Sequence, residues 1–291
     1  MRPTSGERAF GSINTLLMIG LCVVMLYPFI YVLFASLSDA ASFIQHRGIM
    51  LRPAGFNLDA YRAVFDNPMI ARGYRNTLLY VVLGTSINLF MTALGAYVLS
   101  RPNLYFKNAV MFFIVVTMVF HGGLIPTYLL VNQLGMMNSM WALLIPTAIN
   151  TFNLIIMRTA FQGIPVSLDE SARMDGANDW TILFRIVLPL SMPVVAVMIL
   201  WYAVGHWNSF FSALVYLRDR EAYPLQLVLR EILIANDTDS MMTDAGASDK
   251  YAIGETIKYA TIIVSTLPII CLYPFLQKYF VKGVMIGAIK E

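Results

Sequence analysis

The sequence predicts an all-α integral membrane protein with six transmembrane helices. Of its 291 residues, 58% are hydrophobic and only 13% are charged, whereas soluble domains carry roughly a quarter charged residues. The charged residues are also clustered, which leaves long apolar stretches between them. These stretches are continuous, and the alternating segments of about ten residues that build transmembrane β-barrels are absent from them.

Five stretches contain no charged residue: 9–38, 76–100, 108–157, 186–217 and 259–277. One membrane-spanning helix needs about 20 apolar residues, so the third stretch is long enough for two helices, divided by the turn-like sequence QLGMMNS at 133–139. The six spans are therefore expected at about 11–36, 76–100, 107–131, 139–161, 184–206 and 256–280. The first apolar stretch is longer than the core of a signal peptide, which favours a retained anchor.

Flanking charges predict the orientation, because cytoplasmic loops are enriched in Lys and Arg. Basic residues precede the first span, occupy the short loop 101–107 and follow the last span, which places both termini in the cytoplasm. The first loop disagrees with this rule, since it carries five arginines (Arg47, Arg52, Arg62, Arg72 and Arg75).

The segment 164–193 is short and charged, and it lies between two apolar stretches. Ser167 and Glu170 have the spacing of a capping box at a helix start, and Gly176 follows Asp175 where a left-handed C-cap would end the helix. A second helix is expected from Asn178 or Asp179 to Pro189. Such a helix–turn–helix between membrane spans is typical of a docking surface.

Polar residues inside the spans are candidates for a substrate path. His121, Gly122 and Gly123 precede Pro126 and favour a break in the third span, which would either line a cavity or allow close helix packing. Asn150 and Asn153 lie almost one turn apart and share a helix face. They would contact substrate or hold helices together.

The fifth span ends in Trp201, Tyr202, His206, Trp207 and Asn208. Rings combined with amide and imidazole groups suit sugars, whose apolar faces stack on aromatic rings while their hydroxyls form hydrogen bonds. An aromatic belt at the outer membrane interface explains the same residues.

Several classes of protein find little support in the sequence. No glycine is followed by lysine, which rules out a G-x-x-x-x-G-K-[ST] phosphate loop. We find no H-E-x-x-H, C-x-x-C or G-x-S-x-G motif, and we predict no catalytic or metal site and no nucleic-acid partner. The charge-free spans argue against an ion-coupled secondary transporter, because such carriers hold ionisable residues in the membrane.

The helix–turn–helix segment resembles the EAA loop in permeases of bacterial ABC importers. The matching residues are Glu170-Ser171-Ala172, Gly176 and the ending Ile186-Val187-Leu188-Pro189, with Ser171 in place of a small apolar residue. Segments 120–130, 141–161, 207–208, 224–233 and 277–291 are similar to carbohydrate permeases of the oligosaccharide and polysaccharide-fragment branch, of the lipoprotein/polygalacturonan type.

The resemblance implies a type I importer permease, with residues 1–10 in the cytoplasm and 11–291 forming the membrane domain. This domain includes the coupling loop 164–189 and an outer loop at 207–255. The coupling residues it implies are Ser167, Glu170, Ser171, Ala172, Asp175, Gly176, Ala177, Leu188 and Pro189.

The resemblance also implies the partners. These are a second, homologous permease in a heterodimer, two ATPase subunits that hold the ATP and Mg, an extracytoplasmic solute-binding protein, a carbohydrate substrate and membrane lipid. The chain itself would need no cofactor and catalyse no reaction. Three other interpretations remain open: an ion-coupled secondary transporter, a non-transporting receptor or scaffold, and an ABC permease for a solute other than sugar.

Overall fold

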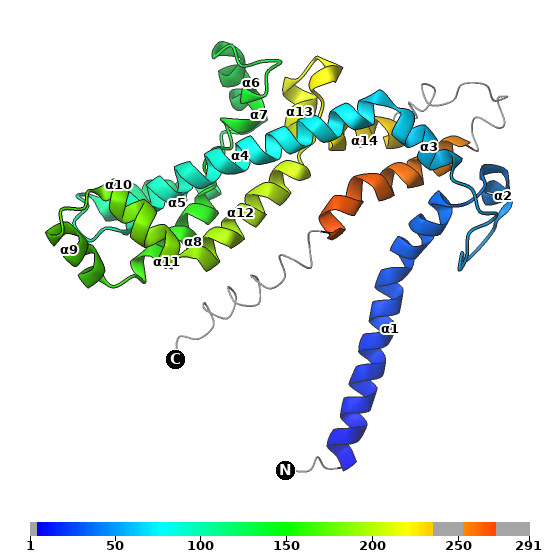
Figure 1. The fold of residues 1–291 in the computed structure, drawn as a ribbon, viewed down its shortest axis with the longest axis horizontal. Coiled ribbons are helices and arrows are strands. Elements are labelled where there is room, and N and C mark those ends of the chain that lie inside the picture. The colour runs from blue at the N-terminus through cyan, green and yellow to red at the C-terminus, as the bar shows by residue number, and fades with distance from the viewer. Residues whose placement is uncertain (1–4, 235–252, 272–291) are drawn as a thin grey trace. The chain divides into compact units, whose positions relative to one another are not determined.

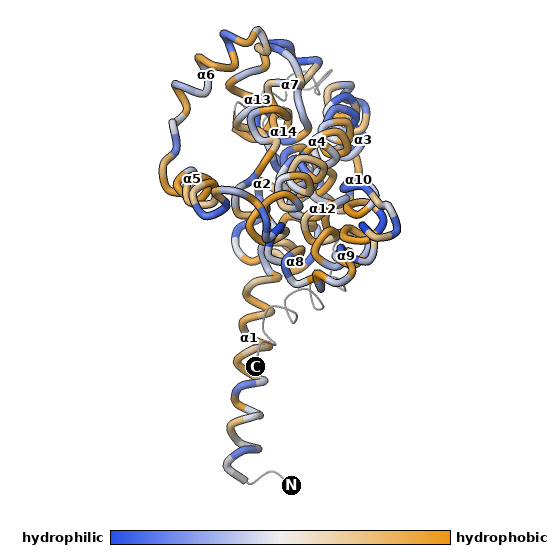
Figure 2. The backbone as a smooth tube through the Cα atoms, turned by 90° about the vertical axis from the view of Figure 1, so that its left-hand side faces the viewer, coloured by the Kyte–Doolittle hydropathy of each residue, from blue (hydrophilic) through white to orange (hydrophobic). Residues whose placement is uncertain are grey.

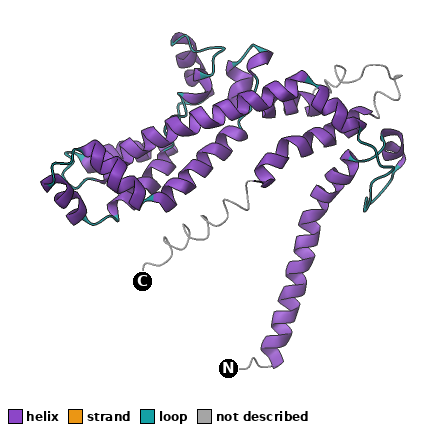
Figure 3. Ribbon diagram, in the orientation of Figure 1, coloured by secondary structure: helices purple, strands orange, loops and turns teal. Residues whose placement is uncertain are grey.

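The computed structural model describes residues 5–234 and 253–271, and the described residues are largely helical (Figures 1 and 3). Within these ranges there is no β-strand, only an isolated bridge between Ser38 and Phe56. The expected all-α class is therefore confirmed. The chain divides into two compact units, Met1–Ile70 with Leu229–Pro268 and Ala71–Val228 with Ile269–Glu291.

The first unit contains α1 (Ser5–Ser36), α2 (Ala40–Gln45), α3 (Asp59–Asp66) and most of the helix Ile253–Cys271. Residues Phe10–Ser36 of α1 are long and apolar enough to cross a membrane, and no part of their most apolar window is buried within the chain. Figure 2 shows α1 as an apolar helix over most of its length. Tyr259 packs edge-on against Tyr31 of α1 and Phe43 of α2, with ring centroids 6.0 and 5.4 Å apart.

The second unit is organised along α4 (Pro68–Ser100), whose 33 residues give it a length of about 50 Å. Its apolar core lies where α4 meets α8 (Thr151–Gln162) and α12 (Met192–Trp207), and α5 (Lys107–Val119) lies against α8. Residues Ala96, Met157 and Met198 are fully buried there.

The N-terminal end of α4 packs against α14 (Leu225–Ile234). The Leu225 amide donates a 2.8 Å hydrogen bond to Thr77 Oγ1, and a side chain at Gly73 would lie only 3.1 Å from Leu225 Cα. A second apolar cluster joins α7 (Trp141–Leu144) and α13 (Phe211–Tyr216). Along the chain, α6 (Leu124–Gln133) precedes α7, and the short 3₁₀ turn Arg220–Ala222 follows α13.

The expected spans are confirmed only in part. Among the described residues, three helices are long and apolar enough to cross a membrane: Phe10–Ser36, Pro68–Ser100 and Ile253–Cys271. Two further pairs of helices are bent, by 111° between Val119 and Leu124 and by 88° between Leu190 and Met192, so that up to five spans are counted. The number six therefore stays a prediction.

Three of the expected spans were wrong as single helices. The span 107–131 breaks at Gly123, which has a φ of +87° and precedes Pro126. The span 184–206 bends at Ser191, between Pro189 and Pro193, and the span 139–161 is interrupted at 145–150, around Pro146. Proline removes a backbone donor and clashes with the preceding turn, which explains why apolar composition alone overestimated helix continuity.

Cys22 and Cys271 are free, and both are exposed in this chain.

Gly84 provides space for His206, and we predict that Gly84→Ala destabilises the second unit. A Cβ on Gly84 would clash with the imidazole ring, which hydrogen-bonds Asn88 at 2.6 Å. Overpacking of this kind costs about 1–3 kcal/mol, measurable as a lower thermal unfolding temperature in detergent. Gly20→Ala in α1 is the control, because a Cβ there meets nothing within 4 Å. Equal melting of both variants would contradict the prediction.

Candidate functional site

The predicted helix–turn–helix is present, and we call residues 164–190 the knuckle. It consists of α9 (Val166–Met174), α10 (Asp179–Ile182), a π-helical turn (Leu183–Val187) and α11 (Leu188–Leu190). The capping box expected at Ser167 and Glu170 was wrong, because α9 begins at Val166 with Pro165 as N-cap and no side-chain cap. Ser167 already lies inside the helix, and its hydroxyl cannot cap the helix start.

The turn of the knuckle is formed by Gly176, as expected. Its φ is +80°, and its amide donates to the Arg173 carbonyl at 3.0 Å while the Ala177 amide donates to the Ala172 carbonyl at 2.9 Å. This pair of hydrogen bonds is a Schellman motif, which needs a residue in the left-handed conformation. The next helix is capped by Asn178, whose side chain accepts from the Thr181 amide at 2.9 Å.

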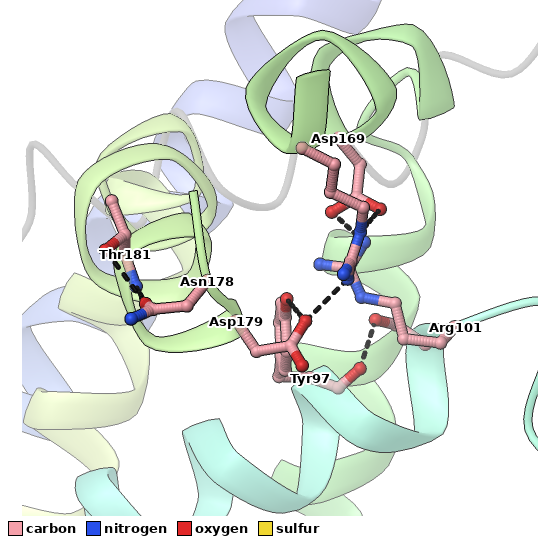
Figure 4. Close-up of polar contacts among 8 residues, drawn as sticks. Tyr97, Arg101, Asp169, Asn178, Asp179 and Thr181 are labelled. Atoms are coloured by element: carbon pink, nitrogen blue, oxygen red, sulfur yellow. Dashed lines mark hydrogen bonds and ion pairs between the residues drawn. The ribbon is translucent and has the colours of Figure 1, made fainter. Parts of the chain in front are cut away.

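Five residues, which we call the anchor network, attach the knuckle to the C-terminal end of α4: Tyr97, Arg101, Asp169, Arg173 and Asp179. Figure 4 labels all of them except Arg173. Asp169 of α9 lies 2.8 Å from Arg101 and 3.1 Å from Arg173. Arg173 continues to Asp179 at 2.5 Å. The Tyr97 hydroxyl donates to the same Asp179 at 3.2 Å, and the Arg101 guanidinium lies 4.0 Å from the centre of the Tyr97 ring.

The Arg101–Asp169 pair is the most buried link of the anchor network, with side chains 24% and 18% exposed. Its contact has the geometry of an ion pair and not of a hydrogen bond, and Arg101 Nε is buried without a hydrogen-bond partner among the described residues. The hydrogen bond from Arg173 lowers the pKa of the Asp179 carboxyl. Hydrogen bonds to Asp169 and Asp179 in turn raise the pKa of Arg173. Arg173 and Asp179 are therefore both charged at neutral pH.

The predicted coupling residues divide into an exposed set and a packed set. Ser167, Glu170, Ser171, Asp175, Gly176 and Pro189 are exposed, whereas Ala172 is buried and Ala177 and Leu188 are half-buried against the core. Apolar side chains accompany the exposed set: Met174 is 88% exposed, and Trp180 and Phe184, 56% and 46% exposed, stack on each other. Exposed apolar side chains rimmed by polar ones are typical of protein interaction sites.

A second candidate site is a cavity of about 260 Å³ in the core of the second unit, which we call the break cavity. It lies beside the interruption between α7 and α8, and five predicted substrate-path residues line it: Asn150, Asn153, Trp201, Tyr202 and His206. Six lining residues were not predicted: Asn88, Leu143, Thr147, Gly205, Ser209 and Ser212. Asn88 had a signal in the sequence, as a large amide in a charge-free stretch.

The other five predicted path residues lie elsewhere. His121, Gly122 and Gly123 form the exposed break between α5 and α6 and do not line the break cavity. Trp207 is buried, and its ring lies 6.2 Å from that of Tyr74, while Asn208 is exposed beyond the end of α12. Five of the ten candidates thus line the break cavity and five do not, and a substrate contact stays a prediction for all ten.

Within the described residues, no group of three or more His, Cys, Asp or Glu side chains is arranged to hold a metal ion. The segment 277–291, one of those that resemble carbohydrate permeases, lies outside the described residues.

Comparison with known proteins agrees with this architecture. Residues 93–286 match the family model described as the inner membrane component of binding-protein-dependent transport systems. The chain belongs to this family. It is 44% identical over 276 residues to the polygalacturonan/rhamnogalacturonan transport system permease protein YtcP of Bacillus subtilis (strain 168), covering 94% of this chain and 95% of that protein.

Solved structures of transporters share the fold. The chain matches one from a crystal structure of a bacterial ABC transporter involved in the import of the acidic polysaccharide alginate, with a TM-score of 0.87, 34% identity, and coverage of 96% of this chain and 99% of that one. A chain of a bacterial alginate ABC transporter in complex with an alginate pentasaccharide-bound periplasmic protein shares the fold, with a TM-score of 0.54 and 17% identity. That match covers 90% of this permease and 92% of that chain.

We predict that the Arg101–Asp169 pair stabilises the docked knuckle. In a double-mutant cycle of Arg101→Met and Asp169→Asn, the coupling energy should lie between about 1 kcal/mol, typical of exposed pairs, and the roughly 3–5 kcal/mol lost when a buried pair is broken. Amide hydrogen exchange of residues 166–179 measures the local opening free energy. The exposed pair Arg62–Asp59 is the control, with a coupling below about 1 kcal/mol. A coupling near zero for Arg101–Asp169 would contradict an anchoring role.

The left-handed conformation of Gly176 generates a further prediction. A Cβ at this position meets nothing within 4 Å, and the effect of a substitution is therefore one of backbone conformation alone. Gly176→Val should open the turn, at a cost of roughly 1–2 kcal/mol, whereas Gly176→Asn should be tolerated because Asn adopts this conformation. Limited trypsin cleavage at Arg173 and Arg185 reports the opening. Equally fast cleavage of both variants would show that the turn does not depend on this conformation.

Proposed function

We propose that this chain is one of two permease subunits of an ATP-driven importer, that it forms half of the pathway for an oligosaccharide, and that the knuckle docks on a cytoplasmic ATPase. The observation that carries the proposal is the knuckle itself. It presents Glu170, Met174 and Trp180 to solvent, and buried and charged contacts fix its other side to the end of α4.

The source of energy in this proposal is a separate ATPase. The sequence has no phosphate loop, and ATP and Mg would be held by two partner ATPase subunits. The chain itself would be no enzyme and would need no cofactor. An exposed carboxylate such as Glu170 suits a basic residue on the partner, and the exposed Met174 suits an apolar pocket.

The orientation follows from which segments lie together. The basic loop 101–107 and the knuckle share one end of α4, and we place this end, with both chain termini, in the cytoplasm. Arg72, one of the five discordant arginines, lies at the other end of α4 and forms a 2.8 Å ion pair with Glu221. Pairing with an acidic residue explains how one of these arginines is accommodated on the outer side.

The substrate class is proposed from the relatives and from the chemistry of the break cavity. The named relatives carry polygalacturonan/rhamnogalacturonan and alginate, and the alginate transporter was crystallised with a pentasaccharide-bound periplasmic protein. Amide, hydroxyl and aromatic groups line the break cavity, without Lys or Arg. An importer for phosphate or another small anion would instead need a cationic side chain at its site, and the absence of Lys and Arg from this lining makes a sugar the better match. We propose a solute-binding protein and a second, homologous permease as further partners.

Transport would proceed by alternating access. Closure of the ATPases on ATP would move the two knuckles of the permease pair together. The anchor network would transmit that movement to α4, because ion pairs and a buried apolar contact join them. The membrane cavity would then open outward to receive sugar from the binding protein.

Copurification in mild detergent tests the proposal. The tagged chain should recover an ATPase with a phosphate-loop motif and a second multi-span permease. Glu170→Ala should weaken ATPase recovery about tenfold, which corresponds to ~1.4 kcal/mol of interface energy. Asp66→Ala, which removes an exposed acidic residue of α3, is the control and should leave recovery unchanged.

Two outcomes would contradict the proposal. A wild-type chain that purifies without any ATPase would favour an ion-coupled secondary transporter. Equal ATPase recovery by the Glu170 and Asp66 variants would remove Glu170 from the docking surface, while leaving the importer itself in place.

A further inference from the structure

The break cavity owes its existence to an interrupted helix. Residues 145–150 lie outside any helix, between α7 and α8. Freed backbone groups inside a membrane protein need partners from neighbouring side chains. Asn88 of α4 donates a 2.5 Å hydrogen bond to the Thr147 carbonyl, and the Asn150 amide donates to the Tyr202 hydroxyl at 3.3 Å. Tyr202 also shares a 2.7 Å hydrogen bond with the buried Thr92.

These contacts hold the interruption open but leave other polar groups of the break cavity unused. Asn153 is only 6% exposed, and within the described residues its side-chain amide has no hydrogen-bond partner. The hydroxyls of Ser209 and Ser212 likewise have none there. These groups line the cavity, where an amide can both donate to and accept from a polar occupant.

The hydrogen bonds of Asn88 also determine the tautomer of His206. Because Asn88 Nδ2 donates to Thr147, its Oδ1 faces His206 Nε2 at 2.6 Å, and this nitrogen must carry a proton. In the neutral ring Nδ1 is then an acceptor. The break cavity thus offers both donors and acceptors, as a sugar hydroxyl requires.

An aromatic surface completes the lining. Trp201 is 36% exposed and lines the break cavity, and its ring stacks on Phe152 with centroids 5.8 Å apart. Indole rings pack well against the apolar face of a pyranose. The volume of about 260 Å³ is just below the roughly 300–1,000 Å³ of pockets for drug-sized ligands, and it suits one sugar ring and not an oligosaccharide.

The lining contains no Asp, Glu, Lys or Arg. A carboxylate in a buried site needs a cation or several directed donors. The cavity therefore suits the hydroxyl groups and the ring of a sugar. It provides no charged partner for the acid group of a uronic acid, and this group would stay in water at the solvent-exposed side of the cavity, where Trp201 is exposed.

We propose that the break cavity is a sugar-binding site of this subunit that holds a single pyranose ring of the passing oligosaccharide through its hydroxyls and apolar face, irrespective of whether that ring carries a carboxylate. The Asn153 amide hydrogen-bonds the hydroxyl groups of the ring, and the indole of Trp201 stacks on its apolar face. This inference rests on the proposed function. It adds that charge selection for acidic polysaccharide fragments takes place outside this cavity.

Equilibrium dialysis of the purified importer, without binding protein, tests the site. The probes are methyl α-D-galactoside, which is neutral, and methyl α-D-galacturonoside, which has the same ring with a carboxylate. Both should bind, with Kd values within about twofold of each other. Asn153→Leu, which keeps the volume and removes the amide, should weaken both by roughly 3- to 10-fold, the effect of one lost hydrogen bond.

Two further variants keep this test decisive. Ser212→Ala deletes one unpaired hydroxyl without adding bulk and should weaken both probes by a smaller factor, even if Asn153→Leu folds poorly. Asn132→Leu makes the same amide-to-leucine change on an exposed position of α6 and should leave both Kd values unchanged.

The outcomes separate this inference from the proposed function. ATPase stimulation by a substrate-loaded binding protein, measured on the same sample, reports the importer. If stimulation is intact, any of three dialysis results would overturn the proposed sugar site alone. These are no binding of either probe, binding of the galacturonoside more than about tenfold tighter than the galactoside, and unchanged binding by both the Asn153 and the Ser212 variants. Absent stimulation in the wild type would count against the importer, while dialysis still reports ring binding.

Discussion

The structure of the second unit depends on one constraint: backbone groups freed by a helix break must find partners inside the protein, because lipid offers none. α4 is the element that meets this requirement. The Asn88 side chain donates a hydrogen bond to the Thr147 carbonyl at the interruption between α7 and α8. Thr92 hydrogen-bonds the Tyr202 hydroxyl, which accepts from the Asn150 amide. A polar cavity in the midst of apolar helices is the consequence.

The same helix carries the other candidate site at its C-terminal end. Tyr97 and Arg101 hold the knuckle, and Asn88 lies nine residues before Tyr97, about 14 Å along the helix at ~1.5 Å per residue. A helix of this kind is stiff compared with the loops at its ends. α4 therefore provides a direct physical connection between the knuckle and the break cavity, which an importer driven from one side of the membrane requires.

The anchor network also explains how a charged segment is fixed to an apolar core. Exposed ion pairs alone contribute little, but here Asp169 is largely shielded and Ala172, Ile182 and Leu183 bury their side chains in the core. Apolar burial supplies most of the stabilisation, and the charges fix the register of α9 on α4. The opposite face remains free, with Glu170 and Met174 exposed.

The sequence by itself determined the helical membrane class, the position of the knuckle and its Gly176 turn, because apolar runs and a left-handed glycine are local signals. It also singled out five residues that line the break cavity, since large amides and aromatics stand out in an apolar span, and their contact with substrate stays a prediction. Only the tertiary structure decided where helices break, that Ser167 is no cap, and that Arg101 pairs with Asp169. Those features depend on which distant side chains come within hydrogen-bonding or ion-pairing distance, and no local pattern encodes this.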